Sequence, residues 1–249
     1  MEILTTMLPS GGYNYNFTSI NISPLNFLQI TKYIENCPKD PMERYMYDIR
    51  MLADEEPNIL NCYVMDLDFI IFFKKLITVS GDMNYTITVK CPDCGKEIKK
   101  KISIESDIHF KQIDEKIMNG ATIRLGDKTY DTIVPTVNDF LDVFSTYVRY
   151  KKISDIKMIK TISLISNFKI MGNQIEKDIL EATHSDITLL MALQELYFDR
   201  LEPIEIKCPT CSKEGRRGVV TVSVESLTVD FFRDIFVNCP INESKILFK

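Results

Sequence analysis

Histidine and catalytic motifs are scarce in this sequence of 249 residues. It contains two histidines, His109 and His184, and no glycine-rich phosphate loop, nucleophile elbow or metalloprotease helix motif. The tetrapeptide Thr183-His184-Ser185-Asp186 brings residue types of catalytic clusters together. However, serine and aspartate just before an apolar periodic segment more often cap a helix. We therefore expect no catalytic residues and no enzymatic activity.

A net positive charge and long uncharged apolar segments are also lacking. The formal net charge is -5, which excludes a global basic field that would attract nucleic acid. The N-terminus has no basic region followed by an apolar run, so we expect no signal peptide. The most apolar window, Ile59 to Val79, contains four charged residues: Asp66, Asp68, Lys74 and Lys75. We interpret it as a buried helix and expect no transmembrane segment.

Cysteine is present in an odd number, seven, and four of these residues form two similar motifs. The motifs are Lys-Cys-Pro-Asp-Cys-Gly-Lys-Glu at 90–97 and Lys-Cys-Pro-Thr-Cys-Ser-Lys-Glu at 207–214, identical at six of eight positions. The absence of a secretion signal predicts a reducing compartment, where thiols stay free or bind metal. We interpret the remaining Cys37, Cys62 and Cys239 as small buried or neutral surface thiols.

The spacing of the paired cysteines predicts one structural zinc ion. Two residues between cysteines let a tight turn direct both sulfurs at one point, and two such turns supply a tetrahedron. The predicted ligands are Cys91, Cys94, Cys208 and Cys211. Four protein ligands leave no open position for substrate, and the lysines at 90, 96, 207 and 213 would offset the formal charge of about -2. A redox pair fits less well, because a redox CxxC usually opens a helix after a strand and we expect strands on both sides.

The periodicity of apolar residues predicts an α+β fold. In this prediction, two zinc-knuckle β-hairpins form a split zinc ribbon, with N-terminal helices and a mostly helical insertion. The predicted domains are an N-terminal strand-helix region at 1–81, the split ribbon at 82–106 plus 202–226, the helical insertion at 107–201 and a C-terminal tail at 227–249.

Turn residues and periodicity define the individual elements. We predict strands at 13–22, 84–90, 97–104, 204–207 and 218–224, and a hairpin of 121–125 with 129–134 around Gly126-Asp127. We predict helices from Pro24 to Cys37, over 41–54 with Asp40 as cap, and over 66–79. The segment 136–201 is expected to be helical in four pieces, broken at Ser154, Gly172 and His184-Ser185.

A basic surface is expected around the knuckles, formed by Lys96, Lys99, Lys100, Lys101, Lys213, Arg216 and Arg217. It has no interleaved aromatics for base stacking, so we favour a solvated face or an acidic protein partner over nucleic acid. A zinc-ribbon nucleic-acid-binding regulator remains the alternative. The aromatic and aliphatic side chains of the helical segment could anchor a protein partner, although apolar helix faces usually form core; they are Phe140, Leu141, Phe144, Tyr147, Tyr150 and Tyr197.

Taken together, these landmarks resemble the baseplate hub assembly proteins of T-even-like tailed myophages. The resemblance rests on the opening Leu8-Pro9-Ser10-Gly11-Gly12-Tyr13 and on a strand followed by a proline-started helix at Pro24. It continues with an aspartate-containing helix that ends at Ser80-Gly81, the knuckle at Cys91 to Gly95, the second knuckle and the terminal Phe231-Phe232-Arg233. Leu196 to Asp199 matches a further Leu-x-x-x-Asp motif with altered spacing, and Ser212 replaces the expected glycine.

The resemblance implies a late viral protein that promotes assembly of the central hub of the tail baseplate. Its partners would be other phage baseplate hub proteins. It would act in the host cytoplasm, either leaving before the particle is complete or remaining in the virion tail baseplate.

Overall fold

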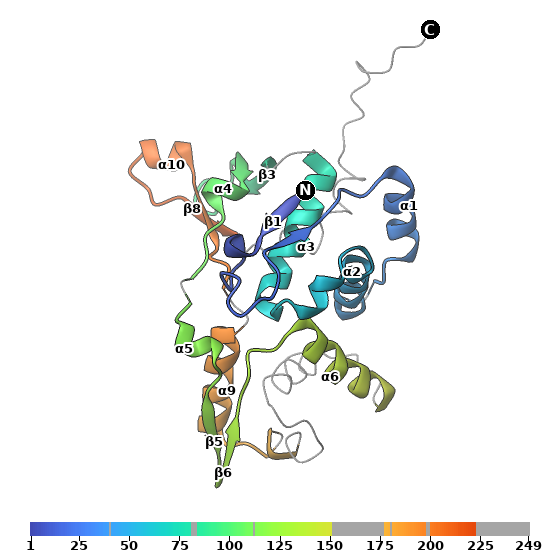
Figure 1. Cartoon of the computed structure of the whole chain (residues 1–249). Coiled ribbons are helices and arrows are strands. Elements are labelled where there is room, and N and C mark those ends of the chain that lie inside the picture. Colours follow the sequence, from blue (N-terminus) through green and yellow to red (C-terminus); the bar gives the residue numbers. More distant parts are fainter. Residues whose placement is uncertain are drawn as a thin grey trace. The chain divides into compact units, whose positions relative to one another are not determined.

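The computed structural model of the chain describes residues 1–39, 41–80, 84–111, 113–150, 177–179, 181–197 and 200–222. Within these residues, helices alternate with two-stranded antiparallel sheets, which confirms the predicted α+β class (Figure 1). The chain divides into two compact units. Unit 1 comprises Met1–Ile22, Pro38–Ile71 and Ile108–Glu202; unit 2 comprises Ser23–Cys37, Phe72–Asp107 and Pro203–Lys249.

Unit 1 begins with a small sheet in which β1 (Glu2–Leu4) pairs antiparallel with β2 (Ser19–Asn21). The prediction of a strand over 13–22 is wrong for its first half, where the chain turns. Asn14 has a φ angle of 59°, in the left-handed region that strands exclude. The pairing strand β1 was not predicted, because three residues are too few to show an alternating pattern.

A buried carboxylate explains why Tyr15 faces inward and not along a strand. The Tyr15 hydroxyl donates to Asp66 in α3 (Val64–Ser80), and the backbone N–H and Oγ of Ser10 donate to the same carboxylate, each at 2.7 Å. The backbone N–H of Tyr63 donates to the Tyr15 oxygen at 2.6 Å. Hydrogen bonds therefore hold residues 10–15 on the first turn of α3. The alternation of apolar residues in this segment does not reflect a strand.

Helix α3 confirms the interpretation of the apolar window as a buried helix. Every residue from Val64 to Ile77 except Asp68 is buried, including Lys74 and Lys75. The helix begins two residues before the predicted start at Asp66. Among the residues that the structure describes, no helix is both long and apolar enough to cross a membrane.

The other elements of unit 1 largely follow the predicted pattern. They are η1 (Thr5–Met7), α2 (Pro41–Glu55), η2 (Pro57–Asn61), α5 (Glu115–Met118), β5 (Thr122–Leu125), β6 (Lys128–Asp131), α6 (Val137–Tyr150) and α9 (His184–Tyr197). The helix over 41–54 and the hairpin around Gly126-Asp127 are confirmed. The predicted cap Asp40 lies outside the described residues, and the four-residue α5 was not predicted.

The predicted helical segment 136–201 contains α6 at its start and α9 near its end. Its last two residues are not helical, because Leu201 forms an isolated β-bridge with Phe110. The predicted breaks at Ser154 and Gly172 lie outside the described residues, whereas the break at His184 is confirmed as the start of α9. Phe140, Phe144 and Tyr197 are buried, so these three belong to the core and do not form an exposed anchor. The side chains of Tyr147 and Tyr150 lie outside what is described.

Unit 2 contains both cysteine hairpins. Its elements are α1 (Phe27–Asn36), β3 (Asn84–Lys90), β4 (Glu97–Ser103), α4 (Ile104–Asp107), β7 (Ile204–Lys207), α10 (Pro209–Lys213) and β8 (Val219–Val222), with the second half of α3. Helix α1 starts three residues after Pro24, because Asn26 and Gln29 form a capping box. β3 pairs with β4 and β7 pairs with β8, as predicted. The strand predicted over 218–224 extended to Val224, beyond the described residues.

Candidate metal centre

The first knuckle is a tight turn between β3 and β4. The backbone N–H of Gly95 donates to the Cys91 carbonyl, and that of Cys91 donates to the Lys96 carbonyl, both at 2.9 Å. Gly95 has a φ angle of 69°, so this turn needs a residue that tolerates the left-handed region. The turn returns the chain along β4 and leaves both cysteine side chains at its tip.

The second knuckle differs in structure from the first despite the sequence similarity. Cys208 follows the last residue of β7 and is the N-cap of the five-residue helix α10, in which the Ser212 N–H donates to the Cys208 carbonyl at 3.0 Å. Gly215 supplies the left-handed residue, with a φ angle of 68°, three positions later than Gly95 does in the first knuckle. Ser212 can therefore replace glycine, because its position is helical here.

This helix corrects one step of the sequence interpretation. The expectation of strands on both sides of each motif holds for Cys91 and Cys94 and is wrong for Cys208, which follows a strand and opens a helix. That strand-to-helix geometry is typical of redox pairs, so the flanking strands do not argue against one. The gathering of four sulfurs in one cluster is what disfavours an isolated redox pair.

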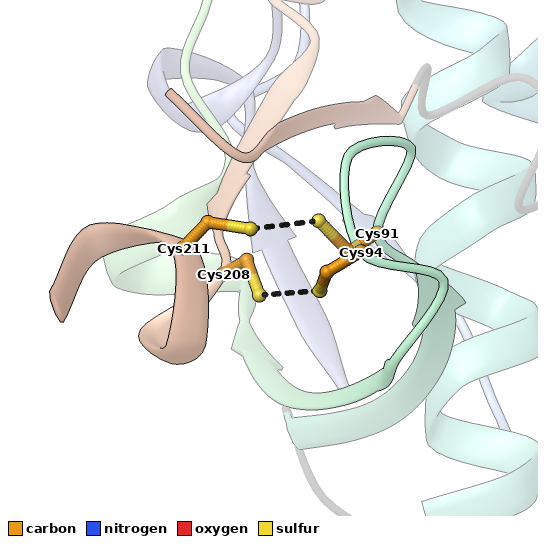
Figure 2. A group of neighbouring side chains, drawn as sticks. All are labelled: Cys91, Cys94, Cys208 and Cys211. Atoms are coloured by element: carbon orange, nitrogen blue, oxygen red, sulfur yellow. Dashed lines mark hydrogen bonds between the residues drawn. The ribbon is translucent and has the colours of Figure 1, made fainter. Parts of the chain in front are cut away.

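All four predicted cysteines meet in one cluster (Figure 2). Their sulfur atoms lie within 4.8 Å of one another, and the cross-knuckle pairs Cys91–Cys211 and Cys94–Cys208 are each separated by 3.7 Å. A tetrahedron with metal–sulfur distances of about 2.3 Å has sulfur–sulfur edges of about 3.8 Å. A disulfide would require about 2.05 Å. The sulfur atoms are therefore free thiols at a spacing that a tetrahedral metal ion fits.

Burial separates this cluster from water. Cys91, Cys208 and Cys211 expose 2%, 1% and 0% of their surface, and Cys94 is half-buried. Four polarizable sulfurs, three of them from buried residues, with no carboxylate or imidazole in the cluster favour a thiophilic metal such as zinc or iron over calcium or magnesium. The chemistry of the donor set therefore fits the predicted metal.

The pKa values of two of the thiols are shifted in opposite directions. The backbone N–H of Cys211 lowers the pKa of the Cys208 thiol, because it donates to the thiolate form. Desolvation and the neighbouring sulfurs raise the pKa of the Cys211 thiol. A bound divalent cation stabilises thiolates and would bring all four sulfurs to the ionised form. The four lysines that flank the cysteine motifs are exposed.

Gly218 joins the two knuckles from a position directly before β8, next to the pair Lys207–Val219 that ends the β7–β8 ladder. Its carbonyl accepts from the Cys208 N–H at 2.7 Å, and its own N–H donates to Asp93 Oδ2 in the first knuckle at 2.8 Å. A Cβ atom at position 218 would lie 2.4 Å from the Cβ of Cys211. The Arg216 guanidinium donates to the Asp93 carbonyl at 3.5 Å. Sequence reasoning missed Asp93 and Gly218; the only signal was that the two motifs differ at Asp93.

The other candidate residues from the sequence have structural roles or lie apart from the cluster. The Thr183 side chain accepts from the Asp186 N–H, and Asp186 accepts from the Thr183 N–H and hydroxyl, so the tetrapeptide caps α9. Of the two residues expected to cap, Asp186 does so together with Thr183, whereas Ser185 lies inside the helix. His109 is exposed, and its carbonyl accepts from Glu202. Cys62 is buried and Cys37 half-buried, whereas Cys239 lies outside the described residues.

No family model, no curated protein and no solved structure matches this chain.

Proposed function

We propose that Cys91, Cys94, Cys208 and Cys211 bind one zinc ion in a structural centre, and that the two hairpins together form a split zinc ribbon. The proposal is carried by one observation, the gathering of four sulfurs from two distant motifs within 4.8 Å. Zinc supplies bonds between the hairpins and no reaction, because four protein ligands complete its tetrahedral coordination. The chain is then a binding protein and not an enzyme.

A ribbon joined by zinc would hold the two ends of the long insertion between Cys94 and Cys208 close together. The sequence places 113 residues between Cys94 and Cys208, and joining the two knuckles closes this segment into a loop. Loop-closure entropy grows only with the logarithm of length, so a metal site can offset it. We propose that the resulting frame presents surfaces to protein partners.

The resemblance to baseplate hub assembly proteins of T-even-like myophages supplies the identity of those partners. On this proposal the chain is a non-enzymatic assembly factor that acts in the host cytoplasm and binds other proteins of the baseplate hub. Nucleic acid fits less well. Two of the seven predicted basic residues are paired with acids, Lys100 with Asp107 at 2.7 Å and Arg216 with Glu214, which weakens the local positive field.

Two measurements test the proposal. Metal analysis and native mass spectrometry of protein purified without chelator should give one zinc ion per chain, absent from Cys208→Ser and retained by Cys37→Ser. Iron in place of zinc would overturn the assignment of the metal, and metal-free folded protein would overturn the centre. For the partner, the zinc-loaded protein should co-migrate with purified baseplate hub proteins; retention on DNA that falls steeply with salt would instead favour the nucleic-acid alternative.

A further inference from the structure

The two cysteine motifs differ at only two positions, and at one of them the structure gives the residue a distinct task. Asp93 stands between the cysteines of the first knuckle where Thr210 stands in the second. Thr210 lies inside α10, where its carbonyl accepts from the Glu214 N–H at 3.3 Å. The Asp93 carboxylate instead reaches the other knuckle and accepts from the Gly218 N–H at 2.8 Å. The contact joins residues 125 positions apart.

The partner of Asp93 is bound directly to the second pair of ligands. Gly218 is buried, and its carbonyl accepts from the Cys208 N–H. A Cβ atom added at this position would lie 2.4 Å from the Cβ of Cys211 and 3.1 Å from the Cβ of Cys208. Moving Gly218 would therefore move both cysteines. The Arg216 guanidinium also donates to the Asp93 carbonyl. The second knuckle is therefore bonded to both the side chain and the backbone of Asp93.

We infer that Asp93 is a positioning residue which sets the second knuckle against the first without any contribution from the metal. The inference rests on the proposed function, since it assigns Asp93 a role toward the bound ion. The hydrogen bond joins protein groups alone, so it can form in the metal-free chain. A site whose ligands are already gathered loses less conformational entropy when the ion binds, and binds it more tightly.

The size of the effect follows from similar arrangements. Residues that orient metal ligands without touching the metal cost about 10- to 100-fold in metal affinity when they are replaced. A hydrogen bond from a backbone N–H to a carboxylate is charge-assisted and therefore stronger than one between neutral groups. We expect Asp93→Ala to bind zinc about 10- to 100-fold more weakly. Asp93→Asn should recover most of this loss, because the amide oxygen can still accept from Gly218.

The test compares Asp93→Ala, Asp93→Asn and the matched control Thr210→Ala, which alters the equivalent position of the other knuckle. Zinc affinity is measured by competition with a chelating dye, and hydrogen exchange of the Gly218 amide is measured in the metal-free protein. The expected result is weaker zinc binding and faster Gly218 exchange for Asp93→Ala, near-normal values for Asp93→Asn, and no change for Thr210→Ala. Equal zinc affinity for Asp93→Ala and the unmodified protein would overturn the inference.

The two readouts separate this inference from the proposed function. If the unmodified protein binds no zinc, the proposed centre fails, and the inferred role toward the ion fails with it even when Gly218 exchange still depends on Asp93. If the unmodified protein binds zinc and Asp93→Ala binds it equally well, the centre stands and Asp93 has no positioning role. If Asp93→Ala does not fold, the near-isosteric Asp93→Asn decides. Normal zinc affinity together with slow exchange of the Gly218 amide supports the inference. Normal zinc affinity together with unprotected exchange of that amide overturns it.

Discussion

Ser10 donates two hydrogen bonds to Asp66, from its backbone N–H and from its hydroxyl, each 2.7 Å long and both across 56 residues of sequence. The Ser10 oxygen also accepts from the Gly12 N–H at 3.2 Å. The Asp66 carboxylate, which also accepts from the Tyr15 hydroxyl, thus attaches the loop of residues 10–15 to the first turn of α3. The arrangement makes both residues sensitive points of unit 1.

Replacing Ser10 by alanine should lower the free energy of unfolding by about 2 kcal/mol, because a hydrogen bond to a buried carboxylate is lost. Chemical denaturation of the purified protein measures this change. Ser145→Ala is the control, since Ser145 is exposed in α6 of the same unit and its hydroxyl donates to the Asp142 carbonyl within that helix. It should change stability by less than about 0.5 kcal/mol. Equal effects of the two substitutions would contradict the buried network.

Asp66 should make stability fall as the pH rises from about 4 to about 6. Burial raises the pKa of Asp66 from 3.8 to about 6, while hydrogen bonds from Tyr15 and Ser10 oppose the rise. The folded state therefore holds the proton more tightly than the unfolded state, and the stabilisation from protonation is complete below about 3.8 and lost once the pH passes about 6. The neighbouring Tyr15, Tyr63 and Cys62 have raised pKa values and stay neutral in this range.

The measurement is the difference in unfolding free energy between the unmodified protein and Asp66→Asn across this range. The difference should change by roughly 3 kcal/mol, from about 1.4 kcal/mol for each pH unit between 3.8 and 6. Groups such as Asp107, whose pKa Lys100 and the Ser103 N–H lower, contribute a change of opposite sign and cancel in the difference. A difference that does not vary with pH would show that Asp66 has an ordinary pKa.

Gly218→Ala should disrupt the metal centre. A methyl group at this position would lie 2.4 Å from the Cys211 Cβ and 3.1 Å from its sulfur, and the φ angle of 43° already disfavours a side chain. Zinc competition should show affinity lost by more than 100-fold. Gly215→Ala is the matched control, because Gly215 has a similar φ angle of 68° with open space around it. Its cost should be limited to about 1–2 kcal/mol of backbone strain, with zinc bound normally.

Removing the metal should lower the melting temperature, and only a thiophilic metal should restore it. A ligand that binds only the folded state adds about 4 kcal/mol at 1,000 times its dissociation constant, so adding a chelator should lower the melting temperature by several degrees. Calorimetry with chelator, followed by zinc or magnesium, measures the effect. Zinc should restore the transition and magnesium should not. Cys91→Ser should melt like the chelated protein or aggregate, and should not respond to chelator.

The local parts of the structure were predictable because they rest on short-range patterns. The Cys-Pro-x-Cys spacing indicated the four sulfurs, and turn residues around Gly126-Asp127 indicated a hairpin that β5 and β6 confirm. The extent of α3 followed from its continuous apolar character. The strand predicted over 13–22 failed because alternation of apolar residues does not reveal that Tyr15 bonds to a carboxylate 51 positions away.

The sequence by itself determined the chemistry of the candidate centre: which four side chains can bind a thiophilic metal, and that strands lead into each knuckle. Only the tertiary structure decided how those side chains meet. Two nearly identical motifs adopt a turn in one case and the helix α10 in the other, and the Asp93 carboxylate bonds to Gly218 across 125 residues. The reason is physical, since spacing along a chain governs local turns, whereas a hydrogen bond between distant segments depends on how the whole chain packs.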